Sequence, residues 1–302
     1  MLVVVTGVAF TWQPDLPVSA LRERWAPPPS AFIEVAGLQV HYRDEGPRDD
    51  PLPIVLIHGT SASLHTWEGW TAALRGTRRV VTFDLPGFGL TGPNASGDYS
   101  DENYVRFTLQ MLDALKLQRV VLGGNSLGGA IAWQTASASP DRVARLILID
   151  AGGYPLESSS VPIGFRIARL PVLRDLMRVT LPRGVIEASV RNVFGDPSRV
   201  TPELVDRYMA TTMRAGNREA LGRRMTQTVW GQGLERISAL TQPTLILWGG
   251  RDRLIPPAHA QRFATDIKGS TLVMFDDLGH VPHEEDPQRT VAVVQQFLAA
   301  KR

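Results

Sequence analysis

From residue 31 onward, the hydrophobic positions of the chain follow two alternating patterns. Two short alternating runs flank Ala36-Gly37 and predict a β-hairpin within 31–46. Continuous apolar runs come next and are typical of strands buried on both faces, at 53–59, 78–84, 119–124 and 144–150. Segments with helical spacing separate these runs, the clearest being 101–117. The alternation predicts an α/β fold, with a mostly parallel, doubly wound sheet.

This pattern is interrupted between residues 154 and 240. No run rich in Val, Ile and Leu occurs there, and prolines and glycines divide the sequence into short helical segments. A strand pattern, a helix, a strand and a final helix then complete the chain, at 242–250, 257–267, 270–275 and 287–300. We therefore expect a helical cap at 154–240, inserted into one α/β core made of 31–153 and 241–302.

Residues 1–30 form an N-terminal extension with two parts. The start, MLVVVTGVAFTW, is apolar but about half of the roughly 20 residues that a membrane span needs. It lacks the basic region and cleavage site of a signal peptide. It is either a packed or frayed chain end, or the remnant of a membrane anchor. Without an anchor we expect a cytoplasmic protein; with one, a membrane-associated or periplasmic protein. Residues 13–30 are rich in proline and predict a tether.

Composition narrows the function classes. Hydrophobic residues make up 43% of the 302 positions, which is enough for a large core, and the net charge of +2 does not indicate a nucleic-acid partner. The absence of cysteine excludes disulfides, thiolate metal sites and a cysteine nucleophile. Residues 154–230 hold 12 Arg, no Lys and 7 acidic residues. This excess of positive charge is either a solvated surface or one that attracts anionic substrates or lipid headgroups.

The segment Gly124-Asn125-Ser126-Leu127-Gly128 matches the G-x-S-x-G pattern of a nucleophilic serine. It lies between a predicted buried strand and a predicted helix, which is the context that the pattern requires. Glycines two residues on either side permit a turn too tight for side chains, so that the Ser126 hydroxyl stands clear. A phosphate-binding loop is the competing interpretation, but the glycine-rich phosphate motifs are absent.

A serine nucleophile needs a base and a group that orients the base. Of six histidines, His280 lies after the last predicted strand, at the same carboxyl edge as Ser126. His283 with the following glutamates could indicate a metal, but no further ligand occurs at metal spacing, and we expect no metal. His58 is expected to be a packed histidine.

Two aspartates compete for the role of the orienting acid. Asp252 follows a predicted strand and two glycines, and Asp150 ends the strand LILID. Asp252 has the better context, because it lies on an exposed turn. The order Ser126, Asp252, His280 is one of the known chain orders of a catalytic triad. The backbone N–H groups of Leu127 and Thr60 are the expected oxyanion donors.

The segments IHGTSASLHTW, DLPGFGLTG, GNSLGG, GGRDRLIP and LGHVPHEEDP resemble the α/β-hydrolase fold superfamily over residues 31–300. Among its serine members, Asn125 and the cap stretch 193–209 resemble the meta-cleavage-product hydrolases, which cleave carbon–carbon bonds. The resemblance implies that Asn125 contacts substrate and that Arg207 binds a substrate carboxylate. It implies no cofactor.

We therefore expect a serine hydrolase that acts on an ester or other small carbonyl substrate through an acyl-enzyme. Carbon–carbon bond hydrolysis, cofactor-free perhydrolysis and non-catalytic ligand binding remain alternatives. Six apolar cap residues either line the pocket or, as is more common for such residues, form the core of the cap: Leu176, Met177, Phe194, Met209, Met213 and Trp230.

Overall fold

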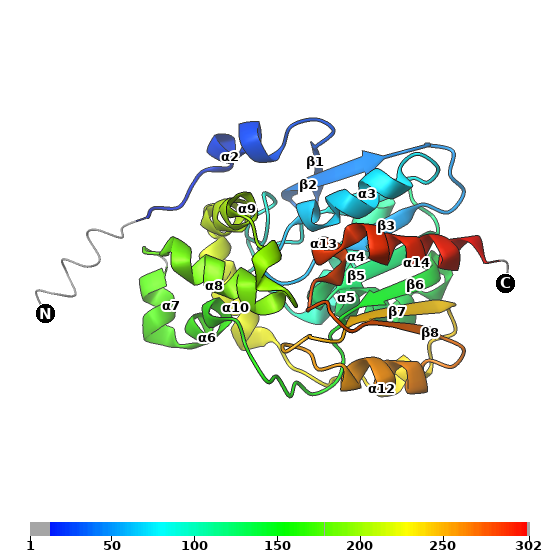
Figure 1. Ribbon diagram of the computed structural model, residues 1–302. Helices are drawn as coiled ribbons and strands as arrows, with labels where there is room; N and C mark the ends of the chain where they lie inside the picture. The colour runs from blue at the N-terminus through cyan, green and yellow to red at the C-terminus, as the bar shows by residue number, and fades with distance from the viewer. Residues whose placement is uncertain (1–12, 178, 301–302) are drawn as a thin grey trace, which may run out of the picture.

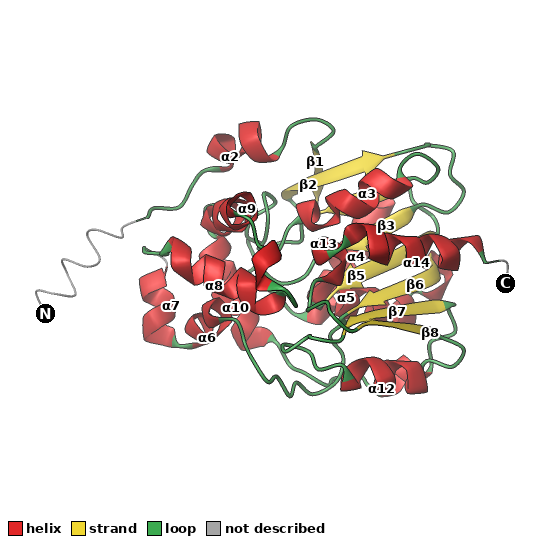
Figure 2. Cartoon of the chain, viewed as in Figure 1, coloured by secondary structure: helices red, strands yellow, loops and turns green. Residues whose placement is uncertain are grey.

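A computed structural model describes residues 13–177 and 179–300 of the chain. Its centre is an eight-stranded sheet in the order β1-β2-β4-β3-β5-β6-β7-β8 (Figures 1 and 2). Strand β2 runs antiparallel to β1 and β4, and all other neighbours are parallel. The strands are β1 (Ala31–Val35), β2 (Leu38–Glu45), β3 (Ile54–Ile57), β4 (Val80–Phe83), β5 (Val120–Asn125), β6 (Val143–Ile149), β7 (Thr244–Gly249) and β8 (Thr271–Phe275).

Helices cover both faces of this sheet, as the alternating sequence pattern predicts. One layer holds α4 (Asp101–Ala114), α5 (Leu127–Ala138), α11 (Glu235–Ser238) and α12 (Ala258–Asp266), and the other holds α3 (Glu68–Leu74), α13 (Pro282–Glu285) and α14 (Pro287–Ala299). Side chains of β3 alternate between the two cores: Val55 and Ile57 pack on the first layer, and Ile54 and Leu56 on the second. Because β3 is buried on both faces, it consists of an unbroken apolar run.

The antiparallel edge begins with the predicted hairpin. Ala36 and Gly37, at its turn, have φ values of 53° and 76°. Two left-handed residues in a two-residue loop match the twist of the flanking strands. Strand β2 then carries the chain to β4 and into the parallel part of the sheet.

The cap is helical and lies at one end of the molecule, over the carboxyl ends of the strands (Figure 1). Its helices are α6 (Ile163–Arg169), α7 (Pro171–Met177), α8 (Arg183–Val193), α9 (Pro202–Met213) and α10 (Asn217–Gln227). They enclose a small apolar core of their own, around Ile186, Val190 and Val205. These helices follow β6 and precede β7 in the chain.

The segment before β1 differs from the expected tether. It contains helix α2 (Val18–Trp25), and Leu16 forms an isolated parallel bridge with Arg214 of the cap. Asp15 also pairs with the Arg218 side chain, which is 2% exposed. These contacts fix residues 13–16 on the cap. Residues 1–12, where the sequence leaves the anchor question open, lie outside the described residues. Within the part of the chain that the structure describes, no helix is both long enough and apolar enough to cross a bilayer.

Candidate active site

Ser126 occupies the sharp turn between β5 and α5. Its φ of 57° and ψ of −115° are strained for a residue with a side chain. The turn is possible because the flanking glycines leave no room for a Cβ atom. A Cβ on Gly128 would lie 2.1 Å from the Ile57 carbonyl oxygen, and one on Gly124 would lie 2.3 Å from Gly128. The steric reason for the G-x-S-x-G pattern is thus visible in the structure.

Leu127 is the first residue of α5, so its N–H has no acceptor within the helix. Helix α5 also directs its positive end toward Ser126, which favours negative charge there. Thr60 follows the turn after β3 and lies with Ser126 on the wall of the same cavity. Both predicted oxyanion donors are therefore next to the serine.

His280 lies in the loop after β8, and its ring contacts Asp252 in the loop after β7. Nδ1 of His280 is hydrogen-bonded to Oδ2 of Asp252 at 2.7 Å, and both side chains are buried. The other Asp252 oxygen accepts N–H bonds from Leu254 and Ile255. This arrangement holds the carboxylate rigidly and leaves the Nε2 side of the imidazole for the cavity that Ser126 also lines.

Asp150, the rival acid, lies close behind this pair. One of its oxygens accepts the Gly249 N–H at 3.0 Å, and the other is buried without a hydrogen-bond partner among the described residues. Burial and the neighbouring Asp252 charge raise the pKa of Asp150 well above its usual value. Asp252 is hydrogen-bonded to the His280 ring and is held by two N–H groups, so the geometry favours Asp252 as the orienting acid.

Two residues hold the His280 loop in place. The Asn125 side-chain nitrogen donates to the carbonyls of Ile149 and His280, at 3.2 and 2.9 Å. Glu285, 6% exposed, accepts the N–H groups of Gly195, Asp196 and Gly279 at 2.8–2.9 Å. The Glu285 carboxylate therefore joins the base of the cap to the histidine loop. The sequence analysis missed Glu285, because only the fold brings Gly195 and Gly279 together.

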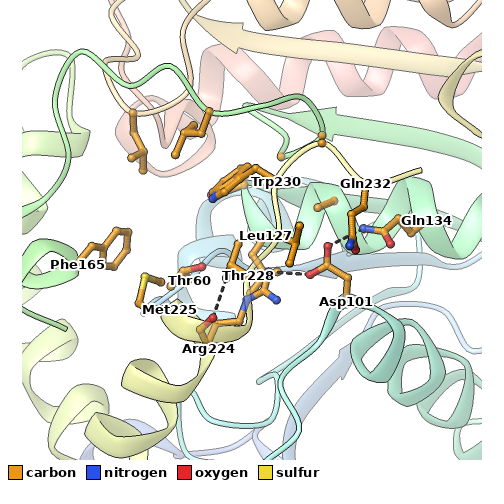
Figure 3. A pocket seen from close by; sticks show the side chains of 18 of the residues that line it. Thr60, Asp101, Leu127, Gln134, Phe165, Arg224, Met225, Thr228, Trp230 and Gln232 are labelled. Carbon is orange, nitrogen blue, oxygen red and sulfur yellow. Dashed lines mark hydrogen bonds and ion pairs between the residues drawn. The ribbon is translucent and has the colours of Figure 1, made fainter. Parts of the chain in front are cut away.

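Two cavities meet at Ser126 and share Thr60, Phe165 and Leu254 as wall residues. The first, which we call the Trp230 cavity, has an apolar wall that includes Leu127, Met225 and Trp230 (Figure 3). Its far end is polar: the Arg224 guanidinium pairs with Asp101 at 2.7 Å, and the Gln134 amide donates to the same carboxylate.

The second cavity, which we call the cap cavity, lies beneath the cap and contains His280. Its wall is mainly apolar: Ala62, Met177, Ile186, Val190, Val193, Leu221 and Val281. An ester carbonyl at Ser126 would therefore have one substituent in each cavity, with His280 on the side of the cap cavity.

Comparison with known proteins agrees with this architecture. Residues 53–287 match the family model described as alpha/beta hydrolase fold. The chain belongs to the α/β-hydrolase fold family. It is 32% identical to 2-hydroxy-6-oxo-2,4-heptadienoate hydrolase of Pseudomonas putida, over 89% of this chain and 96% of that protein.

Two solved structures of α/β-hydrolases are also similar. A meta-cleavage product hydrolase of Pseudomonas fluorescens has a TM-score of 0.76 and 26% identity, over 89% of this chain and 96% of that one. An esterase of Thermogutta terrifontis has a TM-score of 0.73 and 25% identity, with the same coverage. The protein is thus a hydrolase by family, with both carbon–carbon bond hydrolases and esterases among its relatives.

Arg207 differs from the other two predicted substrate-binding residues of this α/β-hydrolase, because it lines neither cavity. Its guanidinium is ion-paired with Glu284, whose other oxygen accepts the Tyr208 hydroxyl at 2.8 Å. A substrate carboxylate at Arg207 would have to replace Glu284. Trp230 and Asn125, in contrast, do line the cavities.

The apolar cap residues divide in the same way. Met177 lines the cap cavity and Trp230 the other. The remaining four line neither cavity: Phe194 and Met213 lie in the cap core, Met209 packs against it, and Leu176 is exposed. Helical spacing identifies apolar positions, but it does not show which of them face a cavity.

The other histidines have structural contacts. His283 is hydrogen-bonded to Thr66 at 2.9 Å and packs on Trp67, with ring centroids 4.2 Å apart. His58 bonds the Gly59 carbonyl and accepts the Leu85 N–H, as expected of a packed histidine. Among the described residues, the group of three possible metal ligands that lie together is Asp150, Asp252 and His280. The His280–Asp252 hydrogen bond already accounts for two of them.

Proposed function

We propose that the protein is a serine hydrolase that cleaves neutral carboxylic esters through an acyl-enzyme. The observation that carries this proposal is the buried 2.7 Å hydrogen bond between His280 and Asp252, beside a strained serine at the meeting point of two cavities. Ser126 is the nucleophile, His280 the general base and Asp252 the acid that orients it. Neutral substrates are proposed first because Arg207 and Arg224 are both paired with carboxylates. Arg169, at the wall of the Trp230 cavity, is a cation that forms no ion pair with the described residues.

In the first step Ser126 Oγ attacks the ester carbonyl carbon, and its proton passes to Nε2 of His280. The oxyanion accepts hydrogen bonds from the backbone N–H groups of Leu127 and Thr60. When the tetrahedral intermediate collapses, the C–O bond to the alcohol breaks and His280 gives the proton to the departing oxygen. A water molecule, deprotonated by His280, then attacks the acyl-enzyme and releases the acid.

We assign the alcohol and acyl parts of the ester to the two cavities from the side on which His280 lies. The alcohol oxygen receives its proton from His280, so the alcohol part occupies the cap cavity. The acyl part then extends into the Trp230 cavity, past Leu127 and toward the Asp101–Arg224 pair. A series of p-nitrophenyl and aliphatic esters tests this assignment. Trp230→Ala should change KM mainly across the acyl series, and Ile186→Ala mainly across the alcohol series.

The primary experiment combines ester turnover with labelling by a fluorophosphonate probe. The protein should be labelled and hydrolyse esters, and Ser126→Ala should lose both, with kcat reduced by about 10³-fold or more. Folding of the variant is checked by circular dichroism. Labelling that persists in Ser126→Ala would assign the nucleophile elsewhere.

Carbon–carbon bond hydrolysis of a ring-cleavage product is the second proposal. It is supported by the similarity to 2-hydroxy-6-oxo-2,4-heptadienoate hydrolase over most of both chains. Such a substrate carries a carboxylate, for which Arg207 is our proposed partner after release from Glu284. The ring-cleavage product is the substrate of this reaction, and loss of its visible absorbance measures the activity. Arg207→Gln should then raise KM for the carboxylate-bearing substrate and leave neutral esters unchanged.

A further inference from the structure

Helices α6 and α7 expose several large apolar side chains within a short stretch of the chain. Val172 is 81% exposed and Leu170 52%. We define the α6–α7 patch as the following five residues: Ile163, Leu170, Val172, Leu173 and Leu176. The two helices pack against each other at the end of the molecule opposite the C-terminus (Figure 1).

Single exposed apolar residues are common in proteins, but a cluster is not. Across the described ranges 13–177 and 179–300, the large apolar side chains classed as exposed are these five and Val229. The patch is therefore a local feature of the cap. Apart from Val229, the rest of the described surface keeps its large apolar side chains at least partly covered.

Positive charge accompanies the patch. Arg166 and Arg169 lie on α6 and are exposed, and neither forms an ion pair or side-chain hydrogen bond with the described residues. The sequence 163–178 contains four arginines and one aspartate. An apolar helix face flanked by arginines has the chemistry of the interface between acyl chains and anionic headgroups of a lipid bilayer.

The same helices form the roof of the active site. Gly164, Phe165 and Met177 line the cap cavity. Arg169 and Val229 are at the wall of the Trp230 cavity. The patch is thus on the outer side of helices whose inner side contacts the substrate cavities.

We propose that the α6–α7 patch docks the protein peripherally on a lipid surface that contains anionic headgroups. Two other occupants fit less well. Residues 1–12 are apolar, and residue 13 is hydrogen-bonded to Val179 near α7, but they contain no acidic residue to pair with Arg166 and Arg169. A second copy would place one set of these arginines against another. This inference concerns binding alone and does not depend on the proposed function.

Vesicle co-sedimentation tests the docking directly. The full chain, with Ser126→Ala to prevent lipid turnover, is mixed with vesicles of phosphatidylcholine alone or with about a third phosphatidylglycerol. We expect binding to the mixed vesicles that decreases at high salt. The double variant Val172→Asp/Leu173→Asp should reduce the partition coefficient about tenfold or more, because charge is excluded from the acyl region. Aspartate is tolerated in the first turn of α7, so folding should be preserved.

The control removes charge at the opposite side of the molecule. Arg119 and Lys268 are exposed residues far from the cap, and Arg119→Gln/Lys268→Gln should bind as the parent does. Arg166→Gln/Arg169→Gln removes the same charge from the cap and should weaken binding to mixed vesicles selectively. Equal binding by the parent and by the Val172/Leu173 variant would overturn the proposal and assign binding to residues 1–12 or elsewhere. The protein could instead fail to bind vesicles and form a dimer that Val172→Asp/Leu173→Asp dissociates. That result would overturn the proposal and assign the patch to contact with a second copy of the chain.

Discussion

The carboxyl edge of the sheet and the α6–α7 roof of the cap face the same cavities, but they are built differently. At the sheet edge, Ser126, Asp252 and His280 are 4–8% exposed, and backbone contacts determine their positions. In the roof, five large apolar side chains are exposed and two arginines have no acidic partner among the described residues. In our proposals, the edge holds the reacting atoms, and the roof forms part of the cavity walls and docks on a lipid surface.

The largest effect is expected at Asp252, the proposed acid of the triad at the sheet edge. Asp252→Asn should lower kcat about 10⁴-fold, because the amide favours the wrong imidazole tautomer. Asp150→Asn should lower kcat by less than about tenfold, because the His280 ring is hydrogen-bonded to Asp252 and because burial and the Asp252 charge raise the pKa of Asp150. Ester hydrolysis by the two variants at neutral pH measures both. The reverse order of effects would transfer the role to Asp150.

Two glycines test whether the edge is as rigid as its contacts indicate. Gly128→Ala places a Cβ 2.1 Å from the Ile57 oxygen and should cost about 3 kcal/mol or more of unfolding free energy. Gly184, in cap helix α8, has no atom within 4 Å of such a Cβ. Gly184→Ala should stabilise the protein by about 0.5–1 kcal/mol. Urea unfolding of both variants measures the difference, and equal effects would contradict the contrast.

Glu285 tests the junction between the two regions. Glu285→Gln keeps the size of the side chain, but it replaces an acceptor of three N–H bonds by a neutral group with only one oxygen. Charge-assisted bonds are about twice as strong as neutral ones, so the histidine loop should lose its fixed position. We expect kcat to fall about ten- to hundredfold with a smaller change in KM. A rise in KM alone would show that Glu285 acts on the cap and not on His280.

The smallest expected effect concerns pH. Burial lowers the pKa of His65 to about 4, and it also lowers the pKa of His58 and of His283. In the unfolded chain these groups bind protons below about pH 6.5. The unfolded state then holds more protons than the folded state, so stability should decrease as the pH falls from about 6.5 toward 4.

Thermal unfolding between about pH 7.5 and 5 measures this loss, which should be a few degrees in Tm. The histidines all belong to the core and none to cap residues 154–240, so the loss should arise from the core. His283→Gln should show a shallower dependence on pH. A Tm that is constant across this range would contradict the burial of neutral histidines.

Much of the core could be predicted from the sequence, because its signals are local. Each buried strand is one apolar run, and the turn at Ser126 needs glycines two residues away on both sides. The Asp252 and His280 loops follow strands whose carboxyl ends meet at one edge, so parallel topology brings them to Ser126.

The cap could be predicted only as a set of helices. Which face of each helix meets a cavity depends on packing between helices, so Met177 and Leu176 cannot be distinguished by spacing. The Arg207–Glu284 ion pair joins positions 77 residues apart and has no local signal. Helix α2 was missed because prolines dominate the segment around it, although they lie at its ends and not within it.

The Glu285 contacts have a consequence for any exchange of caps between members of the family. Gly195 and Gly279 approach so closely that a Cβ on Gly279 would lie 2.4 Å from the Gly195 nitrogen. His280 also donates its backbone N–H to Val193 at 2.7 Å. A chimaera whose junction falls inside 193–196 would separate the general base from its support while leaving the triad sequence intact. Recombination that alters substrate range without loss of turnover therefore has to keep residues 193–196 with the core.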